Sequence, residues 1–138
     1  MKKSDGISVT KVDVAREQID LAIELFFKGA PSIAIHAVAP TAYAILFSLS
    51  KFRNGKFAFD EELRIKPEIL GEWCRKTREA ANFFKHADQD PSATLLFHEH
   101  LNDYKLLQCC FGYEEARGGL TPSMEAFSRW FQIFYPSV

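Results

Sequence analysis

The chain alternates between long stretches with an apolar residue every three or four positions and short stretches rich in glycine, proline and aspartate. That spacing places apolar side chains on one face of a helix. Short connections between helices favour antiparallel neighbours, so the pattern predicts an all-α, up-and-down bundle of about five helices forming a single domain over residues 1–138, with residues 1–10 frayed. We expect these helices over residues 12–28, 32–52, 67–86, 92–116 and 122–135.

The helix expected over residues 32–52 is apolar on nearly every side, which is typical of a central helix packed on several faces. Pro40 lies inside it and should kink it, because a proline there leaves the carbonyl of His36 without its helical donor. Thr121 and Pro122 have the residue types of a helix cap and first turn, so they should begin the last helix.

Composition restricts the classes of partner. The chain has 17 basic and 18 acidic residues, so it lacks the surplus of positive charge that duplex DNA requires, and we expect no duplex DNA partner. No apolar run approaches the roughly 20 residues that span a bilayer, so no membrane partner is expected. The three cysteines include the adjacent Cys109 and Cys110, and there is no CxxC. Reduced thiols and a cytoplasmic location are therefore expected.

The most polar helical face lies on the third expected helix. Because each residue of a helix advances by about 100°, Arg78, Asn82 and His86 stack one turn apart, with Arg75 beside them. A histidine can act as acid or base near neutral pH, and arginines can neutralise charge that develops on a phosphate. These four residues are candidate catalytic residues for phosphodiester cleavage. The alternative is a solvated helix face on which Arg75 pairs with Glu79.

A second group of polar residues follows directly. Lys85, Asp88 and Asp90 are candidate ligand-binding residues at the corner after the third helix, where carboxylates and waters can hold a hard divalent ion or a small ligand. Alternatively, Asp88 or Asp90 caps the next helix through the turn at Pro91. His36 is a further candidate ligand-binding residue, or else a packed histidine whose ring bonds a neighbouring carbonyl.

Other polar motifs argue against metal and cofactor chemistry. His98 and His100 are two residues apart, so on a helix they point about 200° from each other and cannot share a zinc ion. His100 is expected in the core, on the same face as Tyr104. Cys74 is expected to pack inside the bundle. No glycine-rich phosphate loop or dinucleotide motif is present, so no cofactor is expected.

Three stretches resemble an uncharacterised family of small bacterial all-helical proteins. The string NFFKHADQDP at residues 82–91 is the most specific part, and the likeness covers most of the chain. The resemblance supports the all-helical fold and implies no mechanism. The three stretches are residues 22–27 with 32–36, residues 82–91, and residues 120–124 with Ala126, Phe127 and Trp130.

More distantly, the layout is similar to HEPN domains, helical bundles of bacterial defence and toxin systems, many of which are dimeric RNA-cutting enzymes. The likeness lies in the first helix, the short turn, the alanine-rich second helix and a later helix with polar residues before a histidine. HEPN nucleases carry an Arg, often followed by Asn, shortly before a His. Asn82 and His86 match the last two, whereas Ala81 stands at the position of the Arg, and Arg78 is further from His86 than the pattern allows.

Three hypotheses follow. The first is a catalytically silent HEPN-like regulatory or interaction module that forms a homodimer through aromatic surface. The second is a HEPN-type metal-independent ribonuclease, or a nucleotide-acting enzyme, that uses His86 with Arg78. The third is a small-ligand or metal binder at the corner from His86 to Asp90. The missing Arg and the near-neutral charge favour the silent module over the nuclease.

Overall fold

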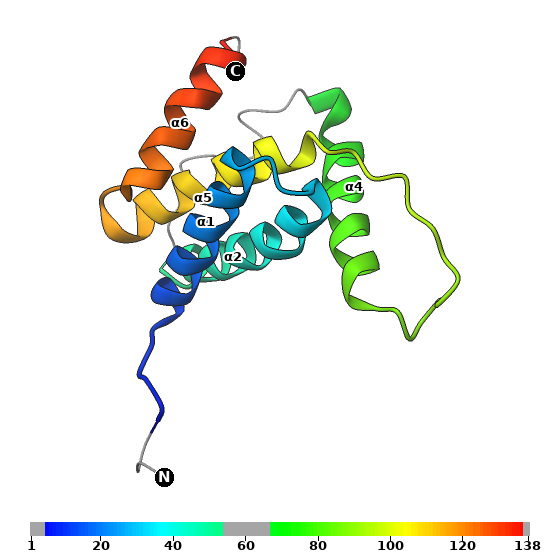
Figure 1. The fold of residues 1–138 in the computed structure, drawn as a ribbon, viewed down its shortest axis with the longest axis horizontal. Helices are drawn as coiled ribbons and strands as arrows, with labels where there is room; N and C mark the ends of the chain where they lie inside the picture. The colour runs from blue at the N-terminus through cyan, green and yellow to red at the C-terminus, as the bar shows by residue number, and fades with distance from the viewer. Residues whose placement is uncertain (1–4, 54–66, 137–138) are drawn as a thin grey trace.

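The computed structural model describes residues 5–53 and 67–136, except for the side chains of residues 67–71, 73 and 74. Within these residues the chain forms helices and no strand, and it is an all-α bundle as the apolar spacing predicts (Figure 1). The side chain of Cys74, which the sequence places inside the bundle, lies outside the described residues. The helices are α1 (Lys11–Phe27), α2 (Ser32–Phe52), α4 (Pro67–Lys85), α5 (Leu101–Arg117) and α6 (Pro122–Phe134).

The helical hairpin of α1 and α2 has well-defined ends. The Thr10 hydroxyl accepts a hydrogen bond from the Asp13 amide at 3.0 Å, and the Asp13 carboxylate accepts one from the Thr10 amide at 2.9 Å, which forms a capping box. Gly29 adopts φ 72° in the connection, a conformation in which other residues are strained. Pro31 precedes α2, which runs without a break through Pro40.

Helix α5, and not α2, is the helix enclosed on most sides. It packs against α1, α2 and α6. Its buried residues include the polar Asn102, Asp103, Lys105 and Gln108 as well as apolar ones. α2 packs against α1, α5 and α4, as expected of a helix with neighbours on several sides, but it leaves one face uncovered. The core residues are Ala15, Ile19, Ala22, Ile23, Ile35, Ala39, Ala42, Leu46, Leu106, Leu107, Cys109, Cys110, Tyr113, Met124, Phe127 and Phe131.

The start of α5 corrects the sequence interpretation. A helix was expected from residue 92, but residues 92–100 contain turns and an extended segment, and α5 begins at Leu101. Within this segment Leu95 and Phe97 are half-buried, while their neighbours Leu96 and His98 are exposed. Alternation with a period of two is the pattern of an extended chain. Residues 95–98 therefore lie beside α4 as an extended segment, which we call the strap.

This correction changes the environment of two sets of residues. The side chain of His100, expected in the core, is 85 % exposed at the N-terminus of α5. Neither Asp88 nor Asp90 caps α5, because both lie well before its first turn. Instead the Ser92 hydroxyl donates to Asp90 Oδ1 at 3.5 Å within the turn.

Helices α4 and α6 lie on opposite sides of the central helices (Figure 1). The cap predicted for α6 is confirmed, since the Thr121 hydroxyl accepts from the Met124 amide and donates to Asp20 Oδ1 of α1 at 2.6 Å. The other side is held through α2, where the Phe84 ring of α4 meets the His36 ring edge-on at 5.6 Å. Among the described helices, α2 is the one against which α4 mainly packs.

The burial of α5 predicts contrasting effects for two leucines. Leu106 is fully buried and Leu96 is 81 % exposed. Leu106→Ala should lower the free energy of unfolding by about 2–5 kcal/mol, since it removes buried methyl groups and leaves a cavity. The matched change Leu96→Ala should cost less than about 0.5 kcal/mol. Urea unfolding of both variants checks this, and equal losses would mean that residues 92–100 are packed as a continuous helix after all.

Candidate functional site

The predicted catalytic column forms only in part and lies in the open. Arg78, Asn82 and His86 are all exposed. α4 ends at Lys85, so His86 is the first residue beyond the helix, although its amide still donates to the Asn82 carbonyl at 3.1 Å. None of the three lines the pocket described below. A general acid or base benefits from an enclosed site in which a reacting group can be held, and this surface supplies no such enclosure.

Arg75, the fourth candidate, points to a different surface. Its guanidinium pairs with Glu79 at 3.1 Å, as the solvated-face alternative predicts. Both side chains are more than half exposed, so the pair contributes little to stability. Arg75 also lines a pocket, whereas Arg78, Asn82 and His86 do not line that pocket.

The ligand-binding corner predicted after α4 is also solvent-exposed. Lys85, Asp88 and Asp90 are exposed, and a chain of turns separates them from one another. The Gln89 amide donates to the His86 carbonyl at 3.3 Å, which fixes the first of these turns. In residues 5–53 and 67–136 no group of three or more His, Cys, Asp or Glu side chains is arranged to hold a metal ion.

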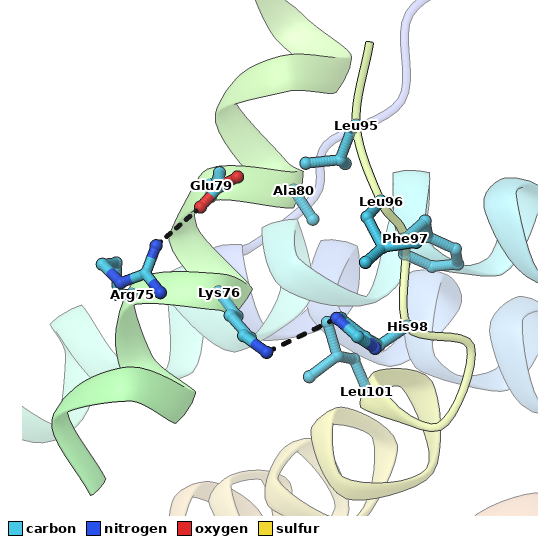
Figure 2. Close-up of a pocket in the computed structure, with 9 residues that line it drawn as sticks. All are labelled: Arg75, Lys76, Glu79, Ala80, Leu95, Leu96, Phe97, His98 and Leu101. Carbon is cyan, nitrogen blue, oxygen red and sulfur yellow. Dashed lines mark hydrogen bonds and ion pairs between the residues drawn. The ribbon is translucent and has the colours of Figure 1, made fainter. Parts of the chain in front are cut away.

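A pocket of about 190 Å³ lies between α4 and the strap of residues 95–98 (Figure 2). Lys76 reaches from α4 toward the strap, and its Nζ lies 3.5 Å from His98 Nε2. Because an ammonium can only donate, the His98 ring accepts in this contact. Arg75 and Glu79 form the outer rim, and the remaining lining residues are apolar: Ala80, Leu95, Leu96, Phe97 and Leu101.

Behind this pocket, His36 is buried at the junction of α2, α4 and α5. Its Nδ1 lies 2.9 Å from Asn102 Oδ1, and its ring packs edge-on against Phe84 and Phe97, with centroids 5.6 and 5.2 Å away. Its Nε2 is buried with no hydrogen-bond partner among the described residues. His36 is thus a packed histidine, as one of the two sequence alternatives holds, although its partner is an amide side chain.

The protonation of His36 is constrained by this environment. Burial lowers its pKa below the ordinary value of 6.5, and the nearby charge of Lys105 lowers it further, whereas the hydrogen bond to Asn102 acts in the opposite direction. The ring is therefore held in its neutral form at neutral pH. The Lys105 ammonium in turn lies over the Tyr43 ring, 3.7 Å from its centroid.

The buried cysteines of α5 are inert. Cys109 donates to the Ala39 carbonyl at 3.5 Å, and both Cys109 and Cys110 are free thiols. Burial raises the pKa of Cys109 to about 12 and also raises that of Cys110. A thiol that stays protonated is a poor nucleophile. These residues therefore contribute to the packing of α5 against α2 and α6.

The outer face of α2 is an uncovered apolar surface. Only 28 % of its most apolar 18-residue window is buried. Among the described helices, α2 alone is long and apolar enough to cross a membrane, a property that core helices of soluble proteins share. The exposed positions of this outer face are Ile33, Ala34, Ala37, Ala44, Phe47 and Ser48.

Sequence reasoning missed His98 and Lys76 as neighbours. The two residues are far apart in sequence and come from different elements, and their contact exists only because the strap is extended. The sequence carried no clear signal for this contact, because Leu95, Leu96 and Phe97 are three apolar residues in a row and do not alternate with polar ones. Comparison with protein-family models, with curated proteins and with solved structures gives no match for this chain.

The buried His36 predicts a pH-dependent stability. Because its folded pKa is lowered, the unfolded chain binds a proton more readily below pH 6.5, and this group's contribution to stability falls as the pH drops from 6.5 toward the folded pKa. His36→Gln should flatten this part of the stability curve, while His86→Gln, at an exposed position, should leave it unchanged. Urea unfolding across this pH range makes the comparison, and parallel curves for wild type and His36→Gln would contradict it.

Proposed function

We propose that this chain is a catalytically silent helical interaction module that associates with a second copy of itself through the outer face of α2. The observation that carries this proposal is that the most apolar helix is not the most buried one. From Ile33 to Ser48 the exposed positions bear no charge, over a length of about 24 Å at 1.5 Å per residue. An uncovered apolar surface of this extent is typical of an interaction site.

The residue types on the outer face suit another helix. Ala34, Ala37, Ala44 and Ser48 have small side chains, so a partner helix can approach closely along the whole face. A two-fold axis across the middle of α2 would place this surface against its own copy, which is how most homodimers form.

Charge favours an antiparallel arrangement. The first exposed charge on this face after Ile33 is Lys51, near the C-terminal end of α2. In a parallel pair the two Lys51 side chains would lie together and repel each other, whereas in an antiparallel pair they lie at opposite ends of the interface. The uncharged middle of the helix then meets the uncharged middle of its partner.

A membrane is a less suitable partner for the same face. α2 is held to α5 by His36 with Asn102, by the Ser50 hydroxyl donating to Glu115 at 2.7 Å, and by Cys109 with the Ala39 carbonyl. Leaving the bundle to span a bilayer would break these buried contacts. Surface helices that bind lipid headgroups usually combine bulky apolar residues with many flanking basic ones, and this face is mostly small and carries one lysine at its end.

The ribonuclease hypothesis has less geometric support. Its residues Arg78, Asn82 and His86 are exposed on α4, and the HEPN arginine position is occupied by Ala81. The silent module shares the helical layout on which the HEPN-like resemblance rests, but it requires no chemistry from these side chains. For this reason we propose association, rather than cleavage, as the role of the bundle.

Sedimentation velocity over a range of concentrations tests self-association. The wild type should show a concentration-dependent shift from monomer to dimer. Ala37→Glu places an uncompensated carboxylate from each copy within the contact and should weaken the dimer at least roughly tenfold. The matched control is Ala126→Glu, the same change at an exposed position of α6, and it should leave the dimer intact.

Three outcomes would overturn the proposal. One is a wild type that stays monomeric at all concentrations, and another is an equal effect of the two glutamate variants. The third is co-flotation of the wild type with vesicles of anionic lipid that Ala37→Glu abolishes and Ala126→Glu does not, because that result would assign the α2 face to a lipid surface.

A further inference from the structure

The pocket between α4 and the strap has two chemically distinct ends. Its rim carries the nitrogen-bearing side chains of Arg75, Lys76 and His98, and its wall is formed by apolar residues of α4, the strap and α5. We propose that this pocket binds a small organic anion, a phosphate or carboxylate attached to an apolar body of the size of one aromatic ring. The inference concerns a surface separate from the α2 face and does not depend on self-association.

The polar end is short of acceptors. Lys76 has three donors, and its described partners are Glu72 at 3.3 Å and the His98 ring at 3.5 Å, with its side chain 36 % exposed. The Arg75 guanidinium has five donors, and one carboxylate, Glu79, pairs with it. Each of the two cations is therefore paired with one carboxylate, and most of their N–H donors have no acceptor among these contacts. An anion between Lys76 and His98 would accept a charge-assisted hydrogen bond from the ammonium and a second hydrogen bond from an N–H of the imidazole.

The apolar end limits the size of the ligand. Ala80 and Leu101 are buried, at 2 % and 8 % exposure, and they form its floor with Phe97. A cavity of roughly 150 Å³ lined by apolar side chains is known to hold benzene, and this pocket is of about 190 Å³. Leu96 stands at the rim with 81 % of its surface exposed, where it can close over a bound ring. Binding would be stabilised by the burial of apolar surface on this leucine and on the ligand ring.

Two other classes of ligand fit less well. A metal cation would meet the like charges of Arg75 and Lys76. An RNA strand needs a row of cations along its backbone and flat surfaces for several bases, whereas this pocket encloses a single group, and the basic residues Arg78 and Lys85 lie outside its lining. The pocket is therefore suited to a compact amphipathic anion.

Binding can be measured on the full chain by ¹H–¹⁵N NMR titration with defined probes. Phenyl phosphate and benzoate carry both parts of the expected ligand, with the two kinds of anionic group. Inorganic phosphate and benzyl alcohol carry one part each. The variants Lys76→Gln and His98→Gln remove the polar end, and Arg78→Gln and His86→Gln are matched controls on the exposed column of α4.

We expect phenyl phosphate or benzoate to shift the amide signals of residues 95–101. Inorganic phosphate and benzyl alcohol, which carry one part of the ligand each, should shift the same signals less. Lys76→Gln should raise the dissociation constant roughly tenfold, the effect of losing one charge-assisted hydrogen bond, and Arg78→Gln should leave it unchanged. The proposal is overturned if neither full probe shifts these signals, if benzyl alcohol binds as well as they do, or if the Lys76 and Arg78 variants lose equal affinity. Binding of a short single-stranded RNA through Arg78 and His86, without binding of the probes, would also overturn it. That result would favour a function for the exposed polar face of α4.

Discussion

The hydrogen bond between His36 and Asn102 joins α2 to α5 at the place where α4 and the strap also pack. The Asn102 amide nitrogen donates to the Ser32 carbonyl at 2.8 Å, so its oxygen is turned toward His36, and Nδ1 of the ring must carry the donated proton. One buried side chain of α5 thereby fixes both the backbone and a side chain of α2. Because these contacts set the rotation of α2 about its axis, they also determine which of its faces remains uncovered.

The same junction positions the pocket. Phe84 of α4 and Phe97 of the strap both pack on the His36 ring and lie 5.8 Å from each other. The neutral state of the ring is suited to this aromatic environment, since a charged imidazolium would be poorly solvated there. The α2 face and the pocket are thus two consequences of one buried polar contact, although they would serve different partners.

Local sequence signals predicted much of the fold. The bounds of α1, α2 and α6 follow from Thr10, Gly29, Pro31 and Thr121, which act through nearby backbone groups. The burial of α5 is not predictable from periodicity, because polar residues such as Asn102 and Lys105 interact with partners that are distant in sequence. The apolar pattern alone favours α2 as the central helix. The spacing of Leu96 and His100 fits a helix as well as an extended chain, so it does not predict the strap.

The candidate site was less predictable for a related reason. The column of Arg78, Asn82 and His86 is a property of one helix, so sequence could place these residues together but could not tell whether they face a cavity or solvent. The pairing of Lys76 with His98, and the partnership of His36 with Asn102, depend on tertiary packing between elements 22 and 66 residues apart in sequence. Only the three-dimensional arrangement reveals them.

The central claim, that α2 meets α2 of a second copy in antiparallel orientation, is tested most directly by pulsed electron paramagnetic resonance between spin labels. Ala37→Cys in a Cys74→Ser background provides the labelling site, since Cys109 and Cys110 are buried and their thiols stay protonated. Helices packed 8–10 Å apart, with position 37 about one turn from the middle of the contact, predict one narrow distance distribution centred at roughly 20 Å. The absence of dipolar coupling at position 37, with coupling instead between labels at position 126, would contradict the account.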